Sequence, residues 1–188
     1  RIAELTRLLK SGSPPEQTAY ALPWLLHLVA DIHQPLHVGR HGDDGGNLVE
    51  IENPHNKRLP FSSLHLYWDD LPGPPWLRGK RLDDNARRLL ERHPPPEQGS
   101  IGIWRDESHR LLATAYPSEA GSLLPIVDDE FHRRSRETAN RRIAEAGYRL
   151  GRLLDSLLVM PFREERNERV MNGLHLIADL HDCRCTPS

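Results

Sequence analysis

The stretch that decides the fold is HLVADIHQPLH, residues 27–37, which places three histidines and one aspartate among mostly apolar residues. We predict a helix from about Pro15 to Ile32, because the residue before Pro35 avoids the helical region and the helix must end there. On that helix His27 and Asp31 are four positions apart, so their side chains project from the same face. His37 follows on the turn. The stretch therefore predicts an imidazole and a carboxylate that reach one cation, with a third ligand beside them.

A second pair with the same spacing, His65 and Asp69, lies in HLYWD on a helix that Ser62 or Ser63 is suited to cap. Neutral imidazole and carboxylate oxygen are zinc ligands, and three protein ligands leave one position for water. One His-x-x-x-Asp pair alone is more often a surface hydrogen bond. Two such pairs with a turn histidine between them predict a metal site at the end of a helical bundle.

The remaining histidines fit the metal hypothesis less well. His33 is out of register with the first pair, so we expect it to have a structural role. His41 and His55 fall in expected loops and should be solvated. The near-repeat LHLIADLH at 174–181 again puts His175 and Asp179 four apart, and we interpret it as a chance match within an amphipathic helix.

Composition indicates one domain of 188 residues with a formal net charge of −2. This charge offers no basis for broad binding to nucleic acid or membranes, so any affinity for phosphate needs a local device such as bound metal. No apolar run reaches the roughly 18 residues of a membrane span. Cys183 and Cys185 are too close for an unstrained disulfide. Neither a signal-peptide pattern nor an initiator methionine stands at Arg1, so we expect a truncated or internal piece of a longer chain.

Helical periodicity is typical of most of the sequence, and the expected fold class is all-α with one small β-hairpin. The hairpin is predicted from strand 48–52, turning through 53–56 into 57–60, after a glycine-rich loop at 38–47. Loops are expected at 72–76 and 93–99. Further helices are predicted over 1–10, 105–115, 124–158 and 164–180, with Phe131, Ile143, Ala146, Leu150, Leu153, Leu154 and Leu157 on the buried side of the long one.

The segments LLHLVADIHQPLH, DGGN and SLHLYWD together resemble the zinc-dependent single-strand-specific nucleases of the S-one/P-one type, which share a fold with bacterial zinc phospholipase C. WRDESHRLLATAYP and IAEAGYRLGRLLDSLL are similar to later helices of that family. The resemblance covers residues 1–158. It implies a helical phospholipase C/nuclease-like domain over 1–160, N-terminally truncated, with a tail at 161–188 that holds a possible extra helix.

The resemblance also implies site residues and chemistry. His27 and Asp31 would serve one zinc of a close pair, with Asp31 reaching the neighbouring metal and acting in catalysis. His37, His65 and Asp69 would hold a second zinc of up to three, and Asn47 would contact substrate. The implied reaction is hydrolysis of phosphodiesters in single-stranded DNA or RNA to 5′-phosphates, with 3′-nucleotidase activity on nucleotides. Export to the periplasm or outside the cell is implied, and no protein partner is.

Several positions depart from the family pattern. The family begins with a tryptophan whose terminal amine binds zinc, then adds two histidines and an aspartate that are not found before residue 27 here. Of the zinc sites only the one formed by His37, His65 and Asp69 is whole. Ala30 replaces a usual glycine and Ser63 a usual asparagine. Two alternatives therefore stay open: a zinc phospholipase C-like phosphodiesterase, and a truncated, inactive zinc-binding helical domain.

Overall fold

The computed structural model describes residues 1–10, 14–39, 42–74, 76–118 and 124–158. These form the helices α1 (Ile2–Lys10), α2 (Pro15–Asp31), α3 (Leu64–Asp70), α4 (Lys80–Arg92), α5 (Ile101–Ala115) and α6 (Asp129–Leu158), the short 3₁₀ helix η1 (Pro35–Val38), and the strands β1 (Glu50–Glu52) and β2 (Phe61–Ser63). The predicted all-α fold with one small hairpin is confirmed. No helix among these residues is both long enough and apolar enough to cross a membrane.

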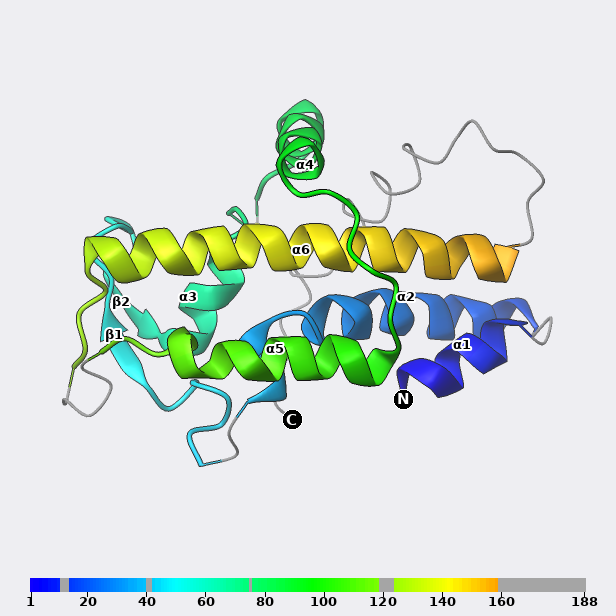
Figure 1. The fold of residues 1–188 in the computed structure, drawn as a ribbon, viewed down its shortest axis with the longest axis horizontal. Helices are drawn as coiled ribbons and strands as arrows, with labels where there is room; N and C mark the ends of the chain where they lie inside the picture. Colours follow the sequence, from blue (N-terminus) through cyan, green and yellow to red (C-terminus); the bar gives the residue numbers. More distant parts are fainter. Residues whose placement is uncertain (11–13, 40–41, 75, 119–123, 159–188) are drawn as a thin grey trace.

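The long helix α6 is the axis of the fold, and the other helices are arranged around it (Figure 1). Helices α2 and α5 run along one side of α6, and α1 packs against α2. Helix α3 and the β1–β2 hairpin lie at the end where α6 begins, while α4 contacts α6 from the side away from α5. The predicted metal-ligand segment therefore leaves α2 near the middle of the molecule and turns toward α3.

Two clusters of buried apolar side chains stabilise this arrangement. One joins the hairpin, α3 and the first half of α6 around Leu64, Trp68 and Phe131, and the other joins α1, α2 and the second half of α6 around Leu25 and Leu150. Along α6 the first cluster extends to Ala139 and the second begins at Ala146. Arg142, one of the buried polar residues described below, lies between these two positions.

The hairpin forms later in the chain than predicted. Residues 57–60 do not pair with β1; β2 does, antiparallel, with Glu50 opposite Ser63 and Glu52 opposite Phe61. The turn between the strands is closed by the Asn53 N–H, which donates to the Pro60 carbonyl at 2.6 Å. Pro60 has no N–H to give to a ladder, so pairing begins after it.

Two helix starts and one whole helix differ from the sequence prediction. Helix α5 begins earlier than Arg105, because the Ser100 hydroxyl caps it by accepting from the Ile103 N–H at 3.3 Å. Helix α6 begins later than residue 124, because Pro125–Val127 pair with β1 through Glu52 and the Asp128 carboxylate then caps the helix. Helix α4 was not predicted. The helix predicted over 164–180 lies outside the described residues and stays a prediction.

Candidate metal centre

All five predicted metal ligands meet in one cluster. Asp31 is the last residue of α2, and His27 lies one turn before it. His37 comes from η1, and His65 and Asp69 come from α3. Asp31 Oδ2 lies 3.1 Å from His27 Nε2 and 3.8 Å from His37 Nδ1. The i,i+4 spacing on α2 and the bend at η1 thus place one carboxylate between two imidazoles.

Asp69 makes the second half of the cluster. Its Oδ1 lies 3.6 Å from His37 Nε2 and its Oδ2 lies 3.5 Å from His65 Nε2. One ring nitrogen of His37, one of His65 and one carboxylate oxygen of Asp69 all lie within 4.8 Å of one another. Among the described residues, this is the only group of three or more His, Cys, Asp or Glu side chains with that spacing. Two imidazoles and a carboxylate are a donor set that zinc accepts, with a position left for water. These three residues fit the ion that the sequence predicts.

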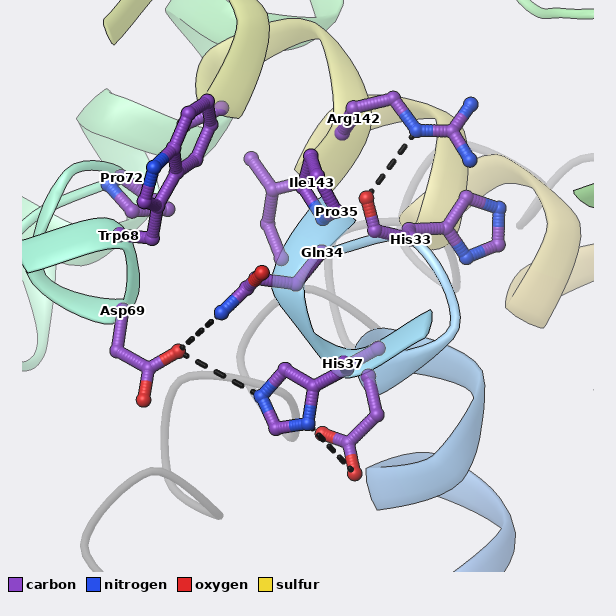
Figure 2. Close-up of a pocket in the computed structure, with 12 residues that line it drawn as sticks. His33, Gln34, Pro35, His37, Trp68, Asp69, Pro72, Arg142 and Ile143 are labelled. Carbon is purple, nitrogen blue, oxygen red and sulfur yellow. Dashed lines mark hydrogen bonds and ion pairs between the residues drawn. The ribbon is translucent and has the colours of Figure 1, made fainter. Parts of the chain in front are cut away.

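Hydrogen bonds to neighbouring groups hold the ligands in place. The Gln34 amide donates to Asp69 Oδ1 at 3.1 Å, which Figure 2 shows beside the contact from His37. His65 Nδ1 lies 2.9 Å from the Gly45 carbonyl oxygen, which can only accept, so Nδ1 carries the hydrogen and Nε2 keeps its lone pair. Such partners fix the tautomer and orientation of a ligand. Neither Gln34 nor Gly45 was predicted to contact the site residues.

Contacts within the cluster shift the pKa values of His27, His37 and Asp69. The hydrogen bond that His27 donates to the Asp31 carboxylate raises the pKa of His27. Burial lowers the pKa of His37, but Asp69 and Asp31 outweigh it and the net shift is upward. Burial raises the pKa of Asp69, yet the imidazoles of His37 and His65 outweigh it and the net shift is downward. These shifts reflect attraction between imidazoles and carboxylates, and a cation bound among them would supply positive charge to the same carboxylates.

His33 is structural, as the sequence predicted. Its side chain is 1% exposed, Nδ1 donates to the Val29 carbonyl at 2.7 Å, and Nε2 accepts from Arg149 at 2.9 Å. Burial lowers the pKa of His33 to about 3, so the ring is neutral. With both nitrogens bonded inside the protein, His33 fixes the turn between α2 and η1 and binds no metal.

A buried ionic network extends from this turn into α5 and α6. Arg142 Nε donates to the His33 carbonyl at 3.2 Å (Figure 2), and Arg142 Nη2 donates to Ser108 Oγ at 2.7 Å. Glu107 accepts from Arg142 at 2.8 Å and from Arg149 at 2.7 and 2.9 Å. Burial raises the pKa of Glu107, but the two guanidinium groups outweigh it and bring the value to about 2. The ligand turn is thus tied to the long helix by charged hydrogen bonds.

A small pocket opens beside the predicted ligands, between the α2–η1 turn, α3 and α6 (Figure 2). Asp31, His37 and Asp69 form its polar side. Pro72 and Ile143 are part of its apolar side. The cluster therefore faces a recess and is not sealed inside the core.

The structure places the other predicted residues elsewhere. Asn47 lies on the exposed surface of the glycine-rich loop, where its amide donates to the Asp44 carbonyl at 2.9 Å, and its substrate contact stays a prediction. His55 lies in a loop and is exposed, as predicted, and its ring also stacks on His132 with centroids 4.0 Å apart while its Nε2 lies 3.7 Å from Asp129. His41, His175 and Asp179 lie outside the described residues.

Comparison with known proteins gives consistent matches. The family model described as S1/P1 Nuclease matches residues 1–159. Among curated proteins, Endonuclease 5 of Arabidopsis thaliana is 47% identical over 51 residues, and Endonuclease 4 of the same plant is 45% identical over 51 residues, in each case 27% of this chain and 16% of the relative. Endonuclease 1, also from Arabidopsis thaliana, is 45% identical over 49 residues, 26% of this chain and 15% of the relative. The matched segment thus spans about one sixth of each relative's length.

Proposed function

Because the chain belongs to the S1/P1 nuclease family, we propose that it is a zinc-dependent hydrolase of phosphodiester bonds in single-stranded DNA and RNA, which leaves 5′-phosphates and also acts as a 3′-nucleotidase. The observation that carries this proposal is the triad of His37, His65 and Asp69, whose ligand atoms lie within 4.8 Å of one another. Export from the cytoplasm is part of the same proposal and rests on the family alone.

The described side chains have separable tasks in this proposal. His37, His65 and Asp69 would hold one zinc ion, and His27 and Asp31 would serve a neighbouring one. Bound zinc supplies positive charge for the phosphate and lowers the pKa of a coordinated water. Gln34 holds Asp69 in place through its amide hydrogen bond. The Asp31 carboxylate stands between His27 and His37, where it can accept a proton.

The recess beside the ligands gives a reason for selectivity toward single strands. A nucleotide in a flexible strand can turn toward the recess bordered by Pro72 and Ile143 at little cost, whereas a paired base must first be unpaired and unstacked. Attraction of phosphate would come from the metal itself, because the net charge of the chain is −2.

The proposal is tested by zinc titration of the purified chain together with cleavage assays on single-stranded DNA, duplex DNA and phosphatidylcholine vesicles. Zinc binding with cleavage of single-stranded DNA alone is the expected result. His65→Ala should lose zinc binding at unchanged helix content. His109→Ala, which removes an exposed histidine on α5, is the matched control and should bind zinc normally.

Each other outcome points to a different conclusion. Hydrolysis of lipid without cleavage of DNA would replace the proposal with a phospholipase C-like activity. Zinc binding without any hydrolysis would identify an inactive zinc-binding domain. Unchanged zinc stoichiometry in His65→Ala would show that the ligands are misassigned.

A further inference from the structure

We infer that Tyr116 is a positioning residue of the metal centre: its hydroxyl holds Asp43, and Asp43 shapes the loop whose Gly45 carbonyl orients the His65 ring. The inference rests on the proposed function, since it explains how one of the proposed zinc ligands is held. The route from Tyr116 to the predicted ligands runs through Asp43 and the loop.

Tyr116 stands where α5 ends, next to both other parts of the site. Its hydroxyl donates to Asp43 Oδ2 at 2.7 Å. The preceding carbonyl, that of Ala115, accepts from the indole N–H of Trp68 at 2.9 Å, and Trp68 is the neighbour of Asp69 on α3. The end of α5 is therefore bonded both to the ligand-bearing helix and to the glycine-rich loop.

Asp43 organises the loop through its other carboxylate oxygen. Oδ1 accepts from the Gly46 N–H at 3.1 Å. Between these two residues the chain takes the left-handed conformation, with φ of 52° at Asp44, 59° at Gly45 and 85° at Gly46. A Cβ on Gly45 would lie 2.9 Å from the Leu36 carbonyl oxygen, so the loop passes close to η1. One oxygen of Asp43 thus fixes the turn, and the other is fixed by Tyr116.

The loop in turn holds His65 at two points. The Gly45 carbonyl accepts from His65 Nδ1 at 2.9 Å, and the Gly46 carbonyl accepts from the His65 backbone N–H at 3.3 Å. With Nδ1 protonated, Nε2 is left to face Asp69 Oδ2 at 3.5 Å. If the loop shifted, the His65 ring would be held less firmly, and the hydrogen could move from Nδ1 to Nε2. Losing such a fixed orientation and tautomer lowers the affinity of a metal site.

The test is Tyr116→Phe, which removes only the hydroxyl. Its matched control is Tyr148→Phe, which removes a hydroxyl that donates to the Leu90 carbonyl at 3.3 Å, between α6 and α4. Partners of metal ligands typically change affinity by about 10–100-fold, and an effect passed through Asp43 should lie near the lower end, about tenfold. Zinc titration should therefore show about tenfold weaker binding in Tyr116→Phe and wild-type binding in the control.

A second measurement does not depend on zinc. Long-range ¹H–¹⁵N spectra of the zinc-free chain, above the titration range of histidine, report which nitrogen of His65 carries the hydrogen. The wild type should show the Nδ1–H form, and Tyr116→Phe should show an increased share of the Nε2–H form. In an Asp43→Ala background, adding Tyr116→Phe should not change the His65 tautomer further, because Tyr116 acts on the ring through Asp43.

Failures of the two hypotheses are distinguishable. A wild-type chain that binds no zinc refutes the proposed function. Even then, a shift of the His65 tautomer between the zinc-free wild type and Tyr116→Phe still supports the positioning role of Tyr116. A folded Tyr116→Phe variant with unchanged zinc affinity and unchanged tautomer overturns the inference. So does loss of helix content in that variant, which would make Tyr116 a residue of the fold.

Discussion

Glu107→Gln should destabilise the protein strongly, because it removes the only carboxylate that the structure shows contacting both Arg142 and Arg149 within the described residues. The side chains of these arginines are 4% and 1% exposed. The variant keeps the size and the hydrogen-bonding oxygen of the side chain but leaves two buried guanidinium groups without their shared negative charge.

The magnitude follows from the pKa of Glu107, which falls from 4.5 to about 2 in the folded protein. This lowering of the pKa corresponds to about 3 kcal/mol of stability. The carboxylate is 28% exposed, and solvent screening reduces this to about 2–3 kcal/mol. Because the folded pKa is depressed, this contribution is complete above pH 4.5 and is lost as the pH falls toward 2.

Urea denaturation followed by tryptophan fluorescence is a suitable assay, since Trp104 packs 5.4 Å from the Arg149 guanidinium and 5.6 Å from the His33 ring. Glu130→Gln is the control, because Glu130 pairs with Arg133 at an exposed site and should change the free energy of unfolding by less than about 1 kcal/mol. A loss below about 1 kcal/mol for Glu107→Gln at pH 7 would refute the reasoning. So would a difference from wild type that fails to shrink between pH 4.5 and 2.

Two further substitutions test the parts that support the metal centre. Gly45→Ala should lower the free energy of unfolding by about 1–3 kcal/mol, because φ is +59° and the new Cβ would meet the Leu36 carbonyl. The control is Gly42→Ala, where a Cβ meets no atom within 4 Å and stability should not change. Equal losses of stability for the two variants in thermal denaturation would count against this account. Trp68→Phe should cost about 2 kcal/mol through the lost bond to Ala115 and the lost volume of a side chain that is 2% exposed. A change in melting temperature within error would contradict the second prediction.

That the five predicted ligands come together was predictable because their signal is local. His27 with Asp31, and His65 with Asp69, are four positions apart on helices, and Pro35 marks the turn that presents His37. Helix periodicity and proline sterics act over a few residues, so sequence spacing carries this information. What holds the ligands is not local. Glu107 meets Arg142 and Arg149 across 35 and 42 positions, and no short pattern announces that pairing.

Helix α4 was missed for an equally physical reason. It begins after Gly79, with φ of 55° and no side-chain cap, so the usual start signal is absent. Its buried residues, Leu82, Ala86 and Leu89, form a narrow stripe in a sequence that is otherwise charged. Packing on α6 supplies what local propensity lacks. The shift of β2 to Phe61–Ser63 has a similar origin, since Pro60 and the Asn53 turn decide where pairing starts.

The bonds of His33 also bear on protein engineering. HLVADIHQPLH looks like a portable metal-binding cassette, but its central histidine gives both ring nitrogens to Val29 and Arg149, and its backbone carbonyl accepts from Arg142. A designer who transplants residues 27–37 into another helical scaffold would leave that ring without its arginine donor, and the bend that presents His37 would lose its anchor. The transferable unit is the segment together with its matching arginines and glutamate from the two neighbouring helices.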